Sequence, residues 1–406
     1  MKVLVAHPSR QHVRWLLEAL EGKNVLSSFW TLLPDSRCLP AWGFLAFPAI
    51  TKAIRRNDIP EVPLERVHVL WGPLLVQRFF AKTGSVWLRD LGEWFAWTLF
   101  DWWVSMHLKR VKPDLVIGYE MCCLRTFQQA KRLGATCILD AAACHFRWVD
   151  QQILGSKFRA KPLDPCSALR RRKLCEARLA DFIVCPSELA KSTYVRHHLS
   201  RTKVFVNPLG YAPLVFFPRM NGEIKRYLHP TFVYVGQLAN HKGLRVLLDA
   251  FDRVAIKHPS VRLRVVGPTL DLKVTPNENI QVLGRLSPSE LSKELANCDC
   301  LILPSLTDSL GLVVLEALAV GLPVVVSDHV GAMQFVRDGE NGWIVPAGNS
   351  HALASRLGQC VNDIDSVRGM SDQCSASVSD YTWRHYQQRW SNWLDCFAQR
   401  MSMEHP

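Results

Sequence analysis

The stretch that decides the fold runs from residue 303 to residue 325: Leu303-Pro304-Ser305-Leu306-Thr307-Asp308-Ser309-Leu310-Gly311-Leu312-Val313-Val314-Leu315-Glu316-Ala317-Leu318-Ala319-Val320-Gly321-Leu322-Pro323-Val324-Val325. Its pattern predicts a buried strand that ends at Pro304, a loop that carries Asp308, and a helix that begins near Ser309–Gly311. In an open α/β sheet this puts the helix N-terminus, with its unpaired N–H groups and positive dipole end, at the ligand-binding edge. The stretch therefore predicts a site for an anion such as a diphosphate.

A second strand–loop–helix unit lies upstream, over residues 235–244, and brings Lys242 to the same edge. Its ammonium group can neutralise charge on a departing diphosphate. A lone lysine is more often a solvated surface residue, but the neighbouring phosphate-binding helix favours the functional interpretation. Glu316 follows two turns into that helix, where a carboxylate can accept hydrogen bonds from a ribose diol.

Strands alternate with helices twice along the chain, which predicts an α/β protein with two Rossmann-like, doubly wound domains facing across a cleft. Residues 1–218 form the first domain, the polar residues 219–230 a linker, and residues 231–406 the second domain. An aromatic amphipathic helix over 381–399 is the candidate to cross back to the first domain. The predicted strands cover residues 2–6, 113–118, 136–140, 181–185, 231–236, 261–267, 280–284, 300–304 and 323–327.

Composition narrows the class of protein. The chain has 406 residues, of which 48% are hydrophobic and 21% charged, so a disordered chain and a disulfide-stapled miniprotein are excluded. Stretches without charge are too short for a membrane-spanning helix. Thirteen cysteines, an odd number without a signal sequence, indicate reduced thiols and a cytoplasmic location.

Charge is concentrated in the first half. Residues 1–210 carry 31 Lys and Arg against 17 Asp and Glu, whereas residues 211–406 carry 18 against 19, and ten of the fourteen Trp lie in the first half. This suits an anionic partner such as a membrane surface, and a merely basic soluble domain is an equally weighted alternative. No recognition motif supports nucleic acid, so we expect none to bind.

Two segments could contact a membrane, but each also has an ordinary structural interpretation. Leu91–Leu108 is an apolar helix candidate in which Trp94 and Trp97 could face a membrane, but packing against the strand near residues 115–117 is favoured two to one. The basic run Arg170–Lys173 is favoured as a solvated helix face over a contact with lipid phosphates.

Metal and cofactor motifs are weak or missing. Asp363-Ile364-Asp365 has the spelling of a metal-binding Asp-x-Asp but lies in a polar segment, where a solvated turn is favoured. Cys122-Cys123 and Cys298-Asp299-Cys300 lack zinc spacing. Neither a P-loop nor a Gly-x-Gly-x-x-Gly fingerprint follows a strand. We expect no resident cofactor and no fixed metal.

The motifs, taken in order, resemble a known family. They are Gly236-Gln237-Leu238 with Lys242-Gly243, Val265-Val266-Gly267, Val282-Leu283-Gly284, the 303–325 stretch, and Asp338-Gly339 with Asn341-Gly342. This series is similar to that of GT-B retaining glycosyltransferases of family 4, the glycosyl transferases group 1, which use nucleotide sugars. The resemblance is strong over residues 231–357 and weaker over 110–218.

The resemblance implies roles for individual residues. Glu316 matches the second glutamate of the family's Glu-x7-Glu pair, which holds the ribose, and Asp308 stands where the first glutamate touches the donor sugar. Lys242 matches the phosphate-binding lysine, and His145 the first-domain histidine near the reacting sugar, so Lys242, Asp308 and His145 are the catalytic candidates. The implied donor-binding set is Gly236, Gln237, Lys242, Gly267, Leu286, Asp308, Ser309, Leu310, Gly311, Leu312 and Glu316, and the acceptor-binding candidates are Ser9 and Arg10.

The implied activity is transfer of a hexose-type sugar, with retention, from a nucleotide-diphosphate sugar to a glycan or lipid-linked acceptor. The setting would be cell-surface polysaccharide or glycolipid biosynthesis, in the cytoplasm or at the inner face of the membrane. The sequence departs from the family pattern at Asp308, at Gln237 in place of arginine, and at Gln334 in place of glutamate. These departures keep open a non-catalytic nucleotide-sugar-binding protein as the alternative.

Overall fold

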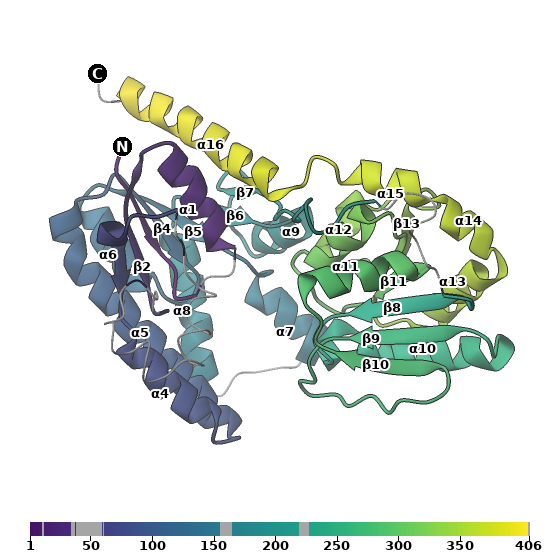
Figure 1. The fold of residues 1–406 in the computed structure, drawn as a ribbon. Helices are drawn as coiled ribbons and strands as arrows, with labels where there is room; N and C mark the ends of the chain where they lie inside the picture. The colour runs from purple at the N-terminus through teal and green to yellow at the C-terminus, as the bar shows by residue number, and fades with distance from the viewer. Residues whose placement is uncertain are drawn as a thin grey trace.

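The computed structural model describes residues 1–9, 12–33, 37, 59, 61–154, 165–218 and 227–404. These residues form two α/β domains, each with a parallel sheet covered by helices, as the sequence predicts (Figure 1). The predicted boundary between the domains, residues 219–230, falls mostly outside the described residues and stays a prediction.

The first domain has a seven-stranded parallel sheet in the order β3-β2-β1-β4-β5-β6-β7. Every residue of β4 is buried, because helices cover both faces, and this explains the unbroken apolar run Leu115-Val116-Ile117. The strand order reverses between β1 and β4, which places the crevice for a ligand at the carboxyl ends of these strands. The strands are β1 (Val3–Ala6), β2 (Leu26–Thr31), β3 (Val67–Val69), β4 (Leu115–Tyr119), β5 (Thr136–Asp140), β6 (Phe182–Cys185) and β7 (Val204–Val206).

The longest helix of this domain, α5, carries the predicted apolar segment and packs on the sheet. Ala96, Phe100, Val104 and Leu108 are fully buried in one core cluster with Val116, so the favoured interpretation of that segment, a core helix, is confirmed. The helices are α1 (Val13–Gly22), η2 (Leu64–Arg66), α4 (Gly72–Ala81), α5 (Val86–Val111), α6 (Leu124–Arg132), α7 (Phe146–Leu154), α8 (Pro165–Leu179) and α9 (Glu188–Arg196).

The second domain repeats the same topology. Its six strands are parallel and follow the order β10-β9-β8-β11-β12-β13, so the order reverses between β8 and β11. The strands are β8 (Thr231–Val235), β9 (Arg262–Val266), β10 (Ile280–Gly284), β11 (Cys300–Leu303), β12 (Val324–Ser327) and β13 (Gly342–Val345). The helices are η3 (Asn240–Lys242), α10 (Leu244–Lys257), α11 (Pro288–Asn297), α12 (Leu312–Ala319), η4 (Gly331–Phe335), α13 (Ser350–Asn362), α14 (Ile364–Gly369) and α15 (Ser371–Ser377).

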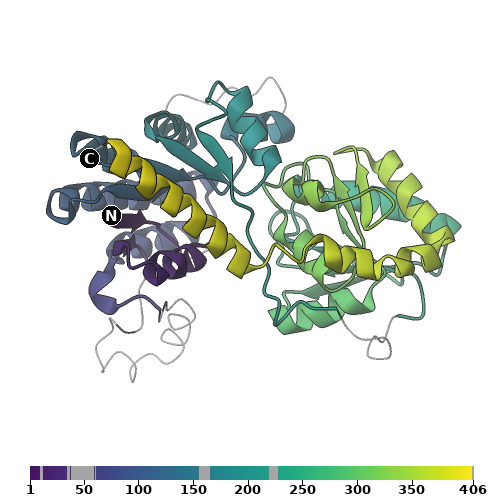
Figure 2. The same ribbon diagram turned by 90° about the horizontal axis from the view of Figure 1, so that it is seen from above.

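The C-terminal helix, α16 (Trp383–Glu404), crosses back to the first domain, as Figure 2 shows. Trp383 stacks on Trp15 of α1 with ring centroids 5.1 Å apart. Lys23 pairs with Asp395 at 2.6 Å between Nζ and Oδ1. The predicted crossing of this helix is therefore confirmed.

Four strands were not predicted from the sequence: β2, β3, β7 and β13. β2 contains the pair Ser27-Ser28, which weakens its apolar pattern. The Ser27 hydroxyl donates to the Val3 carbonyl, and the Trp30 indole N–H donates to the Ser28 hydroxyl, so both polar groups are satisfied inside the fold. β3 is only three residues long.

Candidate active site

Lys242 and Asp308 meet at the point where the strand order of the second sheet reverses. Lys242 ends η3, after β8, and Asp308 lies in the loop after the neighbouring strand β11. Their Nζ and Oδ2 atoms are 2.6 Å apart, and 22% and 13% of the two side chains are exposed. The structure thus brings together two of the three predicted catalytic residues in an ion pair that a ligand can reach.

The two loops that carry this pair are in close contact. The backbone N–H of Leu306 donates to the carbonyl of His241 at 2.9 Å. Gly243 has a φ of 71°, and a Cβ atom there would lie 1.8 Å from the Pro304 carbonyl oxygen. Only glycine allows this approach, so the sequence Lys242-Gly243 fixes where the ammonium group stands.

Helix α12 starts beside the pair. Gly311 is its N-cap residue, with a φ of 79°, and supplies no capping side chain to the first N–H groups. A Cβ atom at Gly311 would lie 2.8 Å from Val330 Cγ1 and 3.7 Å from Asp308 Oδ2. Leu312 is the first residue of the helix, so the uncapped N–H groups at its start lie close to the Lys242–Asp308 pair and can bind an anion.

Glu316 lies farther along α12, and among the residues that the structure describes its side chain has no hydrogen-bond or ion-pair partner. Its side chain is only partly exposed. Burial raises the pKa of its carboxyl group to about 7. A carboxylate without a protein partner can accept hydrogen bonds from the hydroxyl groups of a ligand.

The other predicted donor-binding residues after β8 and β9 line the same end of the sheet. Gly267 has a φ of 139°, and a Cβ there would lie 1.8 Å from the Gly236 carbonyl oxygen, so residue 267 must be glycine for the two loops to pack this closely. The Tyr234 hydroxyl donates to the backbone carbonyl of Gln237 at 2.7 Å, while the Gln237 side chain is exposed. Leu286 packs against the core of the second domain.

Ser309 and Leu310 are held by backbone and side-chain contacts. The Ala332 N–H donates to the Leu310 carbonyl at 2.6 Å. The Ser309 hydroxyl donates to the Ala142 carbonyl of the first domain at 2.7 Å, and the Ser187 hydroxyl of that domain donates to the Ser309 carbonyl at 2.5 Å. The loop that carries Asp308 therefore contacts both domains.

Gln334 joins the two domains by a hydrogen bond. Its side-chain oxygen accepts a hydrogen bond from the Glu188 N–H at the start of α9, at 3.0 Å. Glu188 has its own carboxylate in the first turn of that helix, beside this contact. An amide at position 334 makes the contact between the domains without adding a second negative charge there.

The third catalytic candidate, His145, contacts other aromatic rings of the first domain. Its buried ring stacks on Phe146 and His197 and meets Tyr194 edge-on. Burial, followed by the neighbouring His197, lowers its pKa to about 3, so the imidazole is neutral at physiological pH. A role for His145 near the reacting sugar stays a prediction.

Cys144, the residue before His145, lies closer to the loop that carries Asp308. Burial, and then the negative charge of Asp308, raise the pKa of the Cys144 thiol to about 12. Together with the contact from Ser309 to Ala142, this places the segment after β5 against the loop after β11.

The first sheet has its own polar cluster at the equivalent edge, which the sequence analysis missed. His7 follows β1, Asp140 ends β5, and His12 precedes α1, and their ligand-type atoms lie within 4.8 Å of one another. His12 Nε2 is 2.7 Å from Asp140 Oδ2, and all three side chains are buried. His7 and Asp140 each follow a predicted strand, and this placement was the available signal.

The details favour hydrogen bonding over metal ligation in this cluster. Nδ1 of His7 accepts the Ser9 backbone N–H at 3.1 Å, so in the neutral ring Nε2 carries the proton and has no lone pair for a metal. Burial, and then the charge of His12, lower the His7 pKa to about 3, which keeps it neutral. Ser9, an acceptor-binding candidate, thus orients His7, and the other candidate, Arg10, lies outside the described residues.

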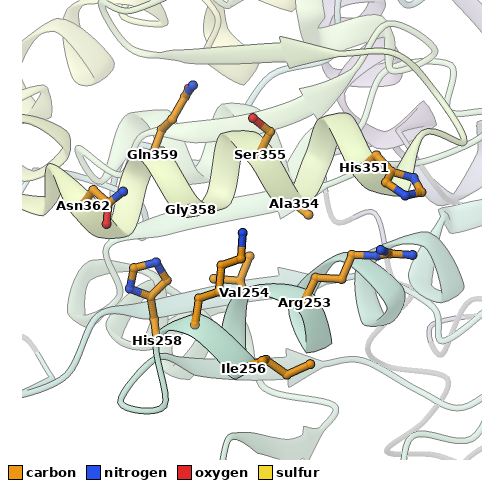
Figure 3. A pocket seen from close by; sticks show the side chains of 11 residues that line it. Arg253, Val254, Ile256, His258, His351, Ala354, Ser355, Gly358, Gln359 and Asn362 are labelled. Carbon is orange, nitrogen blue, oxygen red and sulfur yellow. The ribbon is translucent and has the colours of Figure 1, made fainter.

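A surface pocket lies elsewhere, between α10 and α13, and is lined by His258, His351 and Gln359 among others (Figure 3). Its α10 residues begin at Arg253, roughly 13 Å along the helix from Leu244, the residue after Gly243. It is therefore separate from the Lys242–Asp308 pair.

Comparison with known proteins agrees with this geometry. Residues 224–373 match the family model described as glycosyl transferases group 1. The phosphatidyl-myo-inositol mannosyltransferase of Mycobacterium leprae is 32% identical over 189 residues, which cover 44% of this chain and 48% of that protein. A putative colanic acid biosynthesis glycosyltransferase, WcaL of Salmonella typhimurium, is 29% identical over 164 residues, 35% of this chain and 40% of that protein. The chain thus spans about half the length of these curated relatives, or less.

Solved structures match the whole fold. The crystal structure of Anabaena Alr3699/HepE in complex with UDP and glucose has a TM-score of 0.65 at 16% identity, and the match covers 97% of this chain and 99% of that one. At this identity the likeness shows the fold alone. The two-domain arrangement is the GT-B fold.

Proposed function

We propose, from the premise that residues 224–373 form a glycosyl transferases group 1 domain, that this protein transfers a hexose-type sugar from a nucleotide-diphosphate sugar to a glycan or lipid-linked acceptor. The observation that carries the proposal is the accessible Lys242–Asp308 pair beside the uncapped start of α12. The names of the relatives, a mannosyltransferase and a putative colanic acid glycosyltransferase, support cell-surface glycolipid or polysaccharide biosynthesis.

The charges at the site suit a diphosphate. The ammonium group of Lys242 and the first N–H groups of α12 supply positive charge on adjacent loops. A diphosphate that binds there competes with Asp308 for Lys242, and so it frees the Asp308 carboxylate to accept from hydroxyl groups of the donor sugar. Glu316, whose side chain has no hydrogen-bond partner among the residues that the structure describes, then accepts from the ribose hydroxyls.

We propose transfer with retention, on one face of the sugar. The bond from the anomeric carbon to the diphosphate oxygen breaks, and the acceptor oxygen bonds to that carbon on the same face. The proton of the acceptor hydroxyl passes to the departing phosphate oxygen, so no side chain has to act as nucleophile. Lys242 and the α12 N–H groups stabilise the negative charge that develops on the leaving group.

Two further features of the proposed function are the absence of a fixed metal and a cytoplasmic location. Because Lys242 and the helix N-terminus can neutralise the leaving group, we propose that transfer needs no fixed metal, and we expect activity to survive a chelator. Eleven described cysteines are free thiols, which supports the cytoplasmic location that we propose.

The test is a transfer assay with a panel of common nucleotide sugars, combined with calorimetric binding of UDP. Lys242→Ala should lower kcat by about 10²- to 10³-fold, the usual cost of one lost charge-stabilising donor. Lys293→Ala, which removes an exposed lysine from α11 of the same domain, is the matched control and should leave kcat unchanged.

Three outcomes would revise the proposal. Nucleotide binding without turnover of any donor would replace the transferase with the alternative, a nucleotide-sugar-binding protein. Absence of nucleotide binding would contradict both functions. An inverted anomeric centre in the product, assigned by NMR, would contradict retention.

A further inference from the structure

Helices α4 and α5 form an antiparallel hairpin on the first domain. They pack closely where a Cβ atom at Gly92 would lie 3.0 Å from the Phe80 side chain. The turn between them spans residues 82–85 and lies at the lower edge of the first domain in Figure 1. We call the end of this hairpin the hairpin tip and define it by seven residues: Leu75, Arg78, Phe79, Lys82, Val86, Trp87 and Arg89.

The hairpin tip projects from the edge of the sheet where ligands bind. Helix α5 ends at Val111, just before β4, and its 26 residues span roughly 39 Å. The five residues of β4 span roughly 17 Å. Because α5 runs back along the sheet, its first turns extend roughly 20 Å beyond the carboxyl ends of the strands, on the side of the crevice.

The tip exposes an unusual amount of apolar surface. Phe79 is 68% exposed, Val86 62%, Leu75 57% and Trp87 53%. Leu75 and Phe79 are four residues apart and therefore lie on one face of α4. A cluster of large exposed side chains of this kind marks a contact surface on a protein.

The charge of the tip indicates which partner it contacts. Arg78, Lys82 and Arg89 are exposed, and Asp90, which pairs with Arg89 at 3.2 Å, is the acidic residue between positions 71 and 90. Three cations against one carboxylate give a net charge of +2 there, within the half of the chain that carries the whole positive excess. Aromatic side chains beside exposed cations match the interface of a bilayer that contains anionic lipids.

We propose that the hairpin tip inserts into the headgroup region of an anionic lipid bilayer and holds the crevice at the membrane surface. Among the described residues no helix is long and apolar enough to cross a bilayer, so the contact is with the surface. At the membrane surface the crevice would be near a lipid-linked acceptor. This use of the contact rests on the proposed function, whereas the binding of the hairpin tip to lipid does not.

The experiment is co-sedimentation of the full chain with vesicles of phosphatidylcholine alone or with one third phosphatidylglycerol. We expect binding to the anionic vesicles that falls as salt rises from 50 to 500 mM. The double variant Phe79→Glu, Trp87→Glu should bind at least tenfold more weakly. The double variant Arg78→Gln, Lys82→Gln should lose about 25-fold, about fivefold for each cation.

Ile256→Glu is the matched control, because Ile256 is 81% exposed on α10 of the second domain, and it should bind vesicles like the wild type. Thermal unfolding and UDP binding check that each variant folds. Vesicle binding that the tip variants leave unchanged would overturn the proposal. The proposal would also be overturned if the wild-type chain does not bind vesicles and instead associates with itself, or with another protein, through Phe79 and Trp87. Loss of lipid binding with intact transfer would leave the proposed function standing.

Discussion

The first six strands of each domain follow the same order in their sheet, and β7 extends only the first sheet. The edges where this order reverses nevertheless carry different ion pairs. In the first domain His12 and Asp140 are 2.7 Å apart, with 6% and 8% of their side chains exposed. In the second domain Lys242 and Asp308 are 2.6 Å apart, with 22% and 13% exposed. The topology is shared, but only the second pair is open to a ligand.

The difference comes from what covers each edge. Tyr386 of α16 lies edge-on to His12, with ring centroids 6.4 Å apart, and covers the His12–Asp140 pair. The second pair faces the loop after β5, where Ser309 already contacts Ala142. A buried pair has lost its water and resists opening, whereas a partly exposed pair can exchange its partner for a phosphate. The His12–Asp140 pair is therefore suited to stabilising the fold, and the Lys242–Asp308 pair to binding a ligand.

The largest effect that we predict concerns the close contact in the second domain between Gly243, in the loop after β8, and Pro304, in the loop after β11. Gly243→Ala would place a methyl group 1.8 Å from the Pro304 carbonyl, at a backbone φ of 71°. We expect a loss of more than about 4 kcal/mol in the free energy of unfolding, measured with urea.

Gly339→Ala is the control for backbone strain, because its φ is 77° and no atom lies within 4 Å of the added Cβ. It should cost only about 1 to 2 kcal/mol. If Gly243→Ala and Gly339→Ala lower the free energy of unfolding equally, the close contact between Gly243 and Pro304 contributes nothing to stability.

The second prediction contrasts the two ion pairs. Asp140→Asn should lower the free energy of unfolding by about 3 kcal/mol, since it leaves a buried histidine without its counter-charge. Asp308→Asn should cost about 1 kcal/mol or less, because its pair is partly solvated. Chemical denaturation of both variants checks the difference, and the reverse order of losses would contradict our contrast.

The pH dependence of the buried pair has a definite sign. Although burial opposes both shifts, His12 lowers the pKa of Asp140, and Asp140 raises the pKa of His12. The contribution of Asp140 is present above its ordinary pKa of 3.8 and is lost as pH falls through the lowered value. The contribution of His12 is present below 6.5 and is lost as pH rises through the raised value. The stability difference between wild type and Asp140→Asn should thus be largest between these limits.

The smallest predicted effect concerns ligand binding at the second edge. Burial raises the pKa of Glu316 to about 7, and we propose that only its carboxylate form accepts from the ribose. Below pH 7, UDP affinity should therefore fall up to tenfold per pH unit. Calorimetry on Glu316→Gln, in which the nucleotide phosphates still titrate, supplies the reference. A wild-type pH profile identical to that of Glu316→Gln would contradict this role.

Much of the second edge could be predicted from the sequence because its signals are local. Lys242 and Asp308 each follow an apolar run by a few residues, and neighbouring parallel strands end at one edge. The predicted start of α12, near Ser309–Gly311, lies one to three residues before the first helical residue, Leu312. His145 shows the limit of this reasoning, because its ring packs on Tyr194 and His197 of a helix some fifty residues away in the chain.

The sequence by itself determined the α/β class, the two sheets and the residues that follow their strands, because hydrophobic period and turn residues act over a few positions. Tertiary structure alone decided that His12 meets Asp140, that α16 seals this pair, and that Phe79 and Trp87 remain exposed at the hairpin tip. These features join segments more than a hundred residues apart, or depend on which helix face finds a partner. Local pattern cannot encode such choices, since they are made only when whole elements pack together.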